Sequence, residues 1–300
     1  MLSLSRFHCV SAVTLFALLL CVSSVRAEEP AELPYHQQKN LVYAEVHGVG
    51  LLLDVFTPRS KPNGLGIVDV VSGAYHSDRG KLRDHKQAQM FDIFCSRGYT
   101  VFAIRPGSIA KFNGPEMLDN VNRGILWVKE HAREYQVDPN RLALLGASAG
   151  GHLACMAAVS AADAKSKTRG KAVAVFFPPT DLMNYGGFKI DISGEDQLAQ
   201  SIRRLITPKG SETIDVSRLD ELRTAFSPAR LVKPGLPPFL IIHGTADFMV
   251  PIQQSRVMVA ALQKAEVPVK FIIKEGGGHP WPTIHEEVEL MADWIDGQLK

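Results

Sequence analysis

Apolar residues gather in short continuous runs that recur along most of the chain. Runs of this kind are typical of strands buried on both faces of a parallel sheet. Two earlier stretches, residues 41–46 and 50–56, flank a short segment around Gly48 and predict an antiparallel hairpin at the sheet edge. The later runs, each predicted as a buried strand, are residues 66–71, 100–104, 142–145, 172–177, 239–242 and 269–273.

Helical patterns lie between the runs. Residues 118–128 carry apolar side chains at helical spacing, and Pro115 just before them suits a first helical turn. Thr283, followed three residues later by Glu286, predicts a capping box at the start of the last helix. This alternation predicts a three-layer α/β fold, with a mostly parallel sheet and an N-terminal antiparallel hairpin.

Residues 183–230 interrupt the alternation of strands and helices. They contain two polar-rich helix candidates, residues 194–205 and 216–226. No repeat or Pro/Gly-rich linker divides the chain elsewhere. We therefore expect a single domain over residues 28–300, with a small helical cap at about residues 183–230 that shapes a pocket over the strand ends.

The first 27 residues have the pattern of a secretory signal peptide. Arg6 lies in a short polar start, an apolar run covers residues 10–22, and the segment ends on Val25-Arg26-Ala27. A membrane-spanning helix needs about 20 apolar residues, so the run is short for a stable span. We expect cleavage after Ala27, a secreted or periplasmic mature chain, and no stable membrane insertion; an uncleaved anchor is the alternative.

Charge and cysteine content argue against a nucleic-acid partner and against a metal site. The chain has 33 basic and 31 acidic residues, and loss of Arg6 and Arg26 with the signal leaves 31 of each. This balance, without a clustered basic run, predicts no nucleic-acid partner. Cys95 and Cys155 lie in apolar helical patterns typical of buried free thiols. No Cys/His cluster predicts a metal, and no pattern indicates an oligomeric state.

The candidate chemistry centres on Ser148. It lies in the pattern Gly146-x-Ser148-x-Gly150, after an apolar run and before a small-residue helix pattern. This is the strand-turn-helix context of a nucleophile elbow, in which a serine occupies a sharp turn and the glycines avoid Cβ clashes with neighbouring backbone.

Two further polar residues follow later strands of the predicted sheet. Asp247 comes after residues 239–242, and His279 comes after residues 269–273. Because the carboxyl ends of parallel strands meet at one edge of a sheet, we expect Ser148, Asp247 and His279 to lie together. A serine hydroxyl needs a base to take its proton, and the imidazole needs a carboxylate to fix its tautomer. We predict these three residues as nucleophile, orienting carboxylate and general acid/base.

Several motifs together resemble a known family. They are Gly146–Ala154 (GASAGGHLA), residues 178–182 (PPTDL), 227–229 (SPA), 243–247 (HGTAD), 250–251 (VP) and 278–279 (GH). The chain is similar in these to the exported esterase/lipase branch of the α/β hydrolases, which includes hormone-sensitive-lipase-like carboxylesterases and feruloyl and acetylxylan esterase-like proteins. The resemblance implies ester hydrolysis through an acyl-enzyme without a cofactor, and an oxyanion hole to which the Ala149 amide contributes.

The second part of that oxyanion hole departs from the family pattern. Relatives carry His-Gly-Gly-Gly and an aromatic residue where this chain reads Val-Ser-Gly-Ala-Tyr at residues 71–75. The donors are main-chain amides, so we expect those of Gly73 and Ala74 to serve. The missing glycines put the strength of catalysis in question more than the type of reaction.

Other polar residues are interpreted as structural. Asp69 interrupts an apolar strand. An unpaired buried carboxylate is costly, so we expect Asp69 either to have a partner or to mark an early end of the strand. His152 and Asp181 fall in family motifs but are interpreted as hydrogen-bonded structural residues. The aromatic residues predicted to line a substrate pocket are Tyr75, Tyr185, Phe188 and Trp281.

The leading hypothesis is a secreted serine esterase that hydrolyses short acyl or carbohydrate-linked carboxylic esters. One alternative is a peptidase like prolyl oligopeptidase, because such enzymes share the catalytic domain. Another is a binding protein on a hydrolase scaffold, which the altered residues 71–75 keep open.

Overall fold

The computed structural model describes residues 32–210 and 215–300 of the chain. The predicted signal peptide, residues 1–27, lies outside the described residues. All elements named below belong to the unit Leu33–Lys300.

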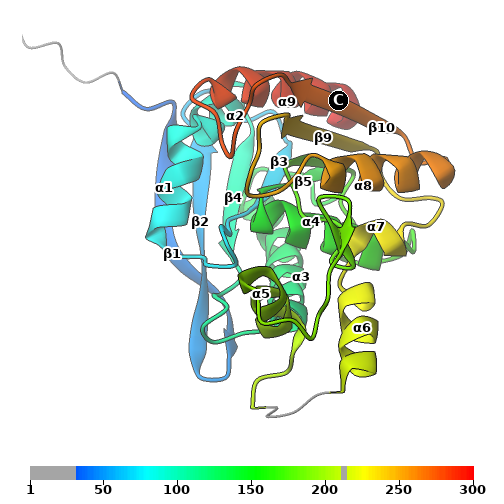
Figure 1. Ribbon diagram of the computed structural model, residues 1–300. Coiled ribbons are helices and arrows are strands. Elements are labelled where there is room, and N and C mark those ends of the chain that lie inside the picture. Colours follow the sequence, from blue (N-terminus) through cyan, green and yellow to red (C-terminus); the bar gives the residue numbers. More distant parts are fainter. Residues whose placement is uncertain (1–31, 211–214) are drawn as a thin grey trace, which may run out of the picture. The chain divides into compact units, whose positions relative to one another are not determined.

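A mixed eight-stranded sheet forms the centre of this unit (Figure 1). Its strands run in the order β1-β2-β4-β3-β5-β6-β9-β10. The pairs β1/β2 and β2/β4 are antiparallel, and all other pairs are parallel. The predicted hairpin and the six later strands are thus confirmed. The strands are β1 (Tyr35–Val46), β2 (Val49–Pro58), β3 (Gly66–Val70), β4 (Thr100–Arg105), β5 (Leu142–Ala147), β6 (Ala172–Phe176), β9 (Phe239–Gly244) and β10 (Val269–Lys274).

Helices cover both faces of the sheet. Because side chains of a strand alternate between faces, Phe102 and Ile104 of β4 join one core, and Val101 and Ala103 join the other. The first core includes residues of α3 (Gly114–His131), α4 (Ala149–Ser160) and α8 (Gln253–Lys264). The second includes residues of α1 (Arg79–Gln87), α2 (Met90–Ser96) and α9 (Ile284–Leu299). The predicted three-layer α/β-hydrolase architecture is confirmed.

The helix ends differ in part from the prediction. Helix α3 has proline in its first turn, as expected, and its capping box is made by Asn113 and Glu116. A 3-10 turn, η1 (Ala132–Tyr135), follows it. The capping box predicted at Thr283 was wrong, because Thr283 makes no side-chain cap bond. Glu286 instead accepts a hydrogen bond from Lys274 Nζ on β10 at 3.2 Å.

The chain between β6 and β9 does not extend the sheet. It forms a small hairpin of β7 (Asn184–Tyr185) and β8 (Phe188–Lys189), then α5 (Gln197–Ile206), α6 (Val216–Ala225) and α7 (Pro228–Leu231). The two predicted helices therefore correspond to α5 and α6. Below, this segment is called the cap segment.

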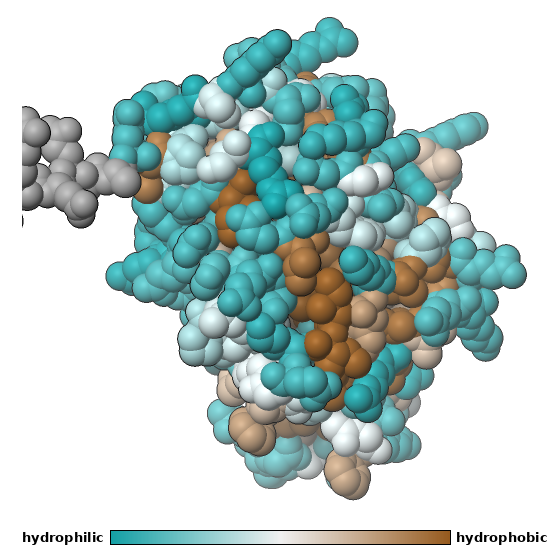
Figure 2. Space-filling view, turned by 90° about the horizontal axis from the view of Figure 1, so that it is seen from above, coloured by the Kyte–Doolittle hydropathy of each residue, from teal (hydrophilic) through white to brown (hydrophobic). Residues whose placement is uncertain are grey.

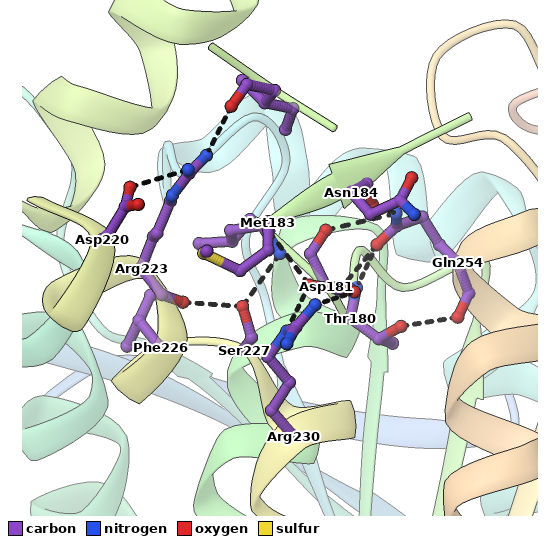
Figure 3. A network of polar contacts seen from close by, with 12 residues as sticks. Thr180, Asp181, Met183, Asn184, Asp220, Arg223, Phe226, Ser227, Arg230 and Gln254 are labelled. Atoms are coloured by element: carbon purple, nitrogen blue, oxygen red, sulfur yellow. Dashed lines mark hydrogen bonds and ion pairs between the residues drawn. The ribbon is translucent and has the colours of Figure 1, made fainter. Parts of the chain in front are cut away.

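Polar contacts join the two ends of the cap segment to each other and to α8 of the α/β core (Figure 3). Arg230 of α7 donates two hydrogen bonds to the Asp181 carboxylate, at 2.8 and 2.9 Å. Gln254 of α8 accepts from the backbone N–H groups of Thr180 and Asp181, and the Ser227 hydroxyl accepts from that of Leu182. Asp181 is therefore structural in this geometry, as interpreted from the sequence.

One face of the unit is mostly polar, and the unit's two cysteines are buried. Figure 2 shows a largely hydrophilic face crossed by a band of hydrophobic residues. No helix in residues 32–210 and 215–300 has the length and apolar character needed to cross a membrane. Cys95 and Cys155 are buried free thiols, as predicted, and burial raises the pKa of Cys155 to about 12.

Candidate active site

Ser148 occupies the sharp turn between β5 and α4. Its backbone has φ 53° and ψ −122°, a conformation that non-glycine residues adopt rarely and that is common at functional turns. A Cβ atom on Gly146 would lie 2.5 Å from backbone atoms of Gly150, and one on Gly150 would lie 2.1 Å from the Val70 carbonyl oxygen. Both positions therefore require glycine, because the neighbouring backbone leaves no room for a Cβ atom. This is the reason predicted from the sequence.

The loops after β9 and β10 touch each other, and this contact brings their polar residues together. A Cβ atom on Gly244 would lie 2.1 Å from the Gly277 carbonyl oxygen. Two backbone hydrogen bonds join the loops, from Thr245 N to Lys274 O at 3.0 Å and from Ala246 N to Gly277 O at 2.9 Å. Asp247 and His279, far apart in the sequence, lie on these two loops.

Ser148, His279 and Asp247 form one hydrogen-bonded chain. Ser148 Oγ lies 2.9 Å from His279 Nε2, and His279 Nδ1 lies 2.6 Å from Asp247 Oδ2. Because the carboxylate accepts the Nδ1 proton, Nε2 of the neutral ring is free to accept the serine proton. The structure therefore brings together the three residues that the sequence placed at the strand ends.

The Asp247 carboxylate is held in its ionised form. Burial opposes its ionisation, but hydrogen bonds from His243, His279 and the Val250 backbone outweigh burial and lower its pKa well below the usual range. The Met249 and Val250 N–H groups both donate to Oδ1, at 2.9 and 2.8 Å. An ionised carboxylate in this position can stabilise an imidazolium on His279.

His243 is a buried neighbour of Asp247 whose role was not predicted from the sequence. Its Nε2 lies 2.8 Å from the Val250 carbonyl oxygen and 3.3 Å from Asp247 Oδ2, and its Nδ1 lies 2.6 Å from Ser255 Oγ. These contacts fix the loop that carries Asp247. Its place at the start of the HGTAD motif, inside a buried strand, was the feature of the sequence that could have indicated this role.

Residues 71–76, which follow β3, run alongside the start of α4. The Gly150 N–H donates to the Ser72 carbonyl at 2.9 Å, and Gly73 and His76 exchange two backbone hydrogen bonds, both 2.9 Å. The prediction that the Gly73 amide is an oxyanion donor was therefore wrong for this conformation, because His76 already accepts its proton. In the described residues, the amides of Ala74 and Ala149 have no backbone acceptor, and both residues line the cavity at Ser148.

Tyr75 connects this loop to α4 and to the cap segment. Its hydroxyl lies 2.5 Å from His152 Nδ1, and His152 Nε2 lies 3.0 Å from the Phe226 carbonyl oxygen. Burial lowers the pKa of His152 to about 4. The neutral ring must donate from Nε2 to the carbonyl, so Nδ1 accepts the Tyr75 proton. His152 is thus a hydrogen-bonded structural histidine, as interpreted from the sequence.

A cavity of about 550 Å³ opens at Ser148 and His279, within the range typical of small-molecule sites. We call it the Ser148 cavity. Tyr75 and Tyr185 line it, as predicted, and Tyr185 donates to the Met249 carbonyl at 2.9 Å. Burial raises the pKa of the Tyr185 phenol, which keeps it protonated. Helix α5 supplies an apolar face at helical spacing that was not assigned to the site from sequence: Leu198, Ile202 and Leu205.

Two predicted pocket residues lie elsewhere. Phe188, at the tip of the β7–β8 hairpin, is 79% exposed and does not line the Ser148 cavity. Trp281 is 5% exposed, donates from Nε1 to Glu287 at 2.6 Å and contacts the rings of Phe176 and Phe177. It lines a second cavity of about 440 Å³, here called the Trp281 cavity. Both assignments were wrong because the position of an aromatic residue in the sequence does not fix which way its side chain points.

Comparison with known sequences agrees with this geometry. The sequence model of the BD-FAE family matches residues 53–262, which include Ser148 and Asp247. The chain belongs to the BD-FAE family. The predicted relationship to α/β-hydrolase esterases is therefore confirmed.

Two of the curated relatives of this BD-FAE chain are named as an esterase and a probable methylesterase. Esterase LipQ of Mycobacterium tuberculosis is 31% identical over 178 residues, 56% of this chain and 39% of LipQ. A probable isoprenylcysteine alpha-carbonyl methylesterase of Arabidopsis thaliana is 27% identical over 241 residues, 76% of this chain and 48% of that protein. The matched part is less than half the length of each of these two relatives.

Solved structures show the same fold. A truncated carbohydrate esterase from gut microbiota superposes with a TM-score of 0.76 and 24% identity, over 90% of this chain and 98% of its own. Esterase 2 of Thermogutta terrifontis, phosphorylated by paraoxon, superposes with a TM-score of 0.63 and 24% identity, over 88% of this chain and 94% of its own.

Proposed function

We propose that this member of the BD-FAE family is a serine esterase that hydrolyses short acyl or carbohydrate-linked carboxylic esters through an acyl-enzyme. The observation that carries the proposal is the hydrogen-bonded chain from Ser148 through His279 to Asp247, with Ser148 opening on a cavity of about 550 Å³. The names of its esterase relatives support it.

In the first half of the proposed reaction, Ser148 Oγ attacks the ester carbonyl carbon while His279 Nε2 accepts the hydroxyl proton. The carbonyl oxygen becomes an oxyanion, to which the Ala74 and Ala149 amides donate. The C–O bond to the alcohol then breaks, and His279 gives its proton to the departing oxygen. In the second half a water molecule, deprotonated by His279, attacks the acyl carbon and releases the acid and Ser148.

The lining of the Ser148 cavity supports a short acyl group as one part of the substrate. The apolar face of α5 and the ring of Tyr185 suit a short hydrocarbon chain. Two structural neighbours are consistent with the two substrate classes: one is titled a carbohydrate esterase and another is an esterase with bound butyrate.

The test is a series of 4-nitrophenyl esters of increasing acyl length, with acetylated sugars and feruloyl esters included. We expect measurable kcat/KM with short acyl groups or sugar acetates, and a steep decline with long acyl chains. Proline-directed cleavage in a peptide panel, with no ester hydrolysis, would instead favour a peptidase. No turnover and no labelling by a fluorophosphonate would favour a binding protein.

We further propose that the mature protein is secreted or periplasmic. The support is the signal-peptide pattern of residues 1–27. N-terminal sequencing of the protein recovered from its native host should begin at Glu28, whereas recovery of an intact Met1 in the cytoplasmic fraction would contradict export.

A further inference from the structure

A buried His–Asp pair that the proposed reaction does not use lies beside the Ser148 cavity. Asp69 of β3 is fully buried, and its side chain points to the face of the sheet covered by α1, α2 and α9. His85 of α1 meets it there, with Nδ1 2.7 Å from Asp69 Oδ2. The partner expected for Asp69 from its sequence position is therefore His85.

The surroundings of Asp69 favour a charged His85. In the described residues Asp69 Oδ1 has no hydrogen-bond partner, so His85 provides the main compensation for a buried carboxylate. An unpaired buried carboxylate is costly, and an imidazolium offsets that cost better than a neutral ring. Burial disfavours the imidazolium, but the Asp69 carboxylate outweighs burial and raises the pKa of His85.

The other ring nitrogen of His85 is available to a ligand. Because Nδ1 is turned inward to Asp69, the Nε2 edge is the one that reaches the cavities, and no described residue hydrogen-bonds to Nε2. The side chain is 9% exposed and lines both the Ser148 cavity and the Trp281 cavity. It therefore presents one N–H donor, nine-tenths buried, to the space that also contains Ser148.

The remaining charges of the Ser148 cavity do not cancel this donor. Lys81 and Asp84 both line the cavity and pair with each other at 3.3 Å. Arg204 of α5 also lines it, and no acidic side chain in the described residues pairs with Arg204. Lys81 is offset by Asp84, and His85 is offset by Asp69. Among the described residues, Arg204 is therefore a cavity cation without an acidic partner, and His85 adds a charged N–H donor.

We propose that His85, supported by Asp69, is a binding subsite for a carboxylate group carried by the ester substrate. The inference rests on the proposed esterase function, and it narrows the substrate to esters that carry a negative charge within the Ser148 cavity. A hydrogen bond from an imidazolium to a carboxylate is stronger than one between neutral groups, which gives the subsite its selectivity. The carboxylate can belong to the acid or to the alcohol.

Two pairs of substrates test the two positions of the carboxylate. The acyl pair is 4-nitrophenyl hydrogen succinate and its methyl ester; the alcohol pair is an acetylated methyl glucuronoside and the corresponding acetylated methyl glucoside. We expect kcat/KM to favour the charged member about tenfold or more in one pair. In His85→Gln this ratio should fall toward one. His76→Gln, which changes another histidine that lines the cavity, should keep it.

A binding measurement separates this inference from the esterase proposal. Calorimetric titration of Ser148→Ala with monomethyl succinate and dimethyl succinate does not depend on turnover. We expect the anion to bind about tenfold or more tightly, and Ser148→Ala/His85→Gln to lose that difference. Thermal midpoints of all variants check that they are folded.

Three outcomes would overturn the subsite. The first is that wild type shows equal kcat/KM and equal affinity for the charged and neutral members of both pairs. The second is a preference for the charged member that His85→Gln retains. The third is that the only preference of wild type is for the neutral glucoside over the glucuronoside. A wild type that hydrolyses no ester, while Ser148→Ala binds the anion through His85, would reject the esterase proposal and leave the subsite standing.

Discussion

Gly244 and Gly277 cross so closely that a Cβ atom on Gly244 would lie 2.1 Å from the Gly277 carbonyl oxygen. This contact joins the loops that carry Asp247 and His279. Gly244→Ala must therefore push the loops apart and lengthen the 2.6 Å hydrogen bond between His279 and Asp247. We expect a lower thermal midpoint and a fall in kcat of about a hundredfold, since small misplacement of catalytic groups is that costly.

The control for this substitution is Gly297→Ala in α9. A Cβ atom there would meet nothing within 4 Å, and alanine favours a helix over glycine. This variant should keep kcat and gain slightly in stability. Equal activity of Gly244→Ala and wild type in the hydrolysis of 4-nitrophenyl acetate would show that the contact does not position the site.

The catalytic role of Asp247 and the structural role of Asp181 can be distinguished by one matched pair of variants. Asp247→Asn removes the charge that orients His279 and should lower kcat by about ten-thousandfold, with a smaller change in KM. Asp181→Asn weakens the pair with Arg230 and should cost stability of about 1–3 kcal/mol without a comparable loss of kcat. Kinetics and urea unfolding measure the two effects; a large loss of kcat in Asp181→Asn would reverse the assignment.

Tyr75→Phe tests how the loop of residues 71–76 is held. The change leaves the buried Nδ1 of His152 without its 2.5 Å donor, at a cost of about 1–3 kcal/mol in unfolding free energy. Because Ala74 lies next to Tyr75, we also expect kcat to fall. The comparison variant is Tyr185→Phe. It removes another phenol hydroxyl from the cavity, the one that donates to the Met249 carbonyl. If Tyr75→Phe lowers neither stability nor kcat, the contact does not hold the loop.

The Asp69–His85 pair predicts a pH-dependent contribution to stability. Burial and Lys81 lower the pKa of His85, but Asp69 and Asp84 outweigh them and raise this pKa above its unfolded value of about 6.5. Its contribution is therefore complete below about pH 6.5 and is lost as the pH rises through the folded-state pKa. The difference in thermal midpoint between wild type and His85→Gln should be larger at about pH 5 than at about pH 9. A difference that does not change with pH would show that His85 does not gain charge on folding.

Much of this architecture was predictable from the sequence because its signals are local. Strands such as β5 and β9 are continuous apolar runs, and the glycines around Ser148 mark a turn that few other residues permit. The meeting of Ser148, Asp247 and His279 followed from one rule, that parallel strands end at a common edge.

The features that were missed depend on the direction of side chains and on contacts between distant segments. Phe188 and Trp281 are aromatic residues expected near the site, but Phe188 is exposed and Trp281 lines the Trp281 cavity instead. The Gly73 amide is occupied because the loop folds back on His76, which no local pattern indicates. Asp69 was recognisable as unusual, whereas its partner His85 is set by how α1 lies on the sheet.

The most direct test of the account is the rate of 4-nitrophenyl acetate hydrolysis by wild type and by Ser148→Ala, together with the site of fluorophosphonate labelling. If Ser148 is the nucleophile, Ser148→Ala loses up to about a millionfold in kcat, and Ser148 is the single labelled serine of the wild type. Unchanged hydrolysis by Ser148→Ala, or labelling of another residue in the wild type, would contradict it.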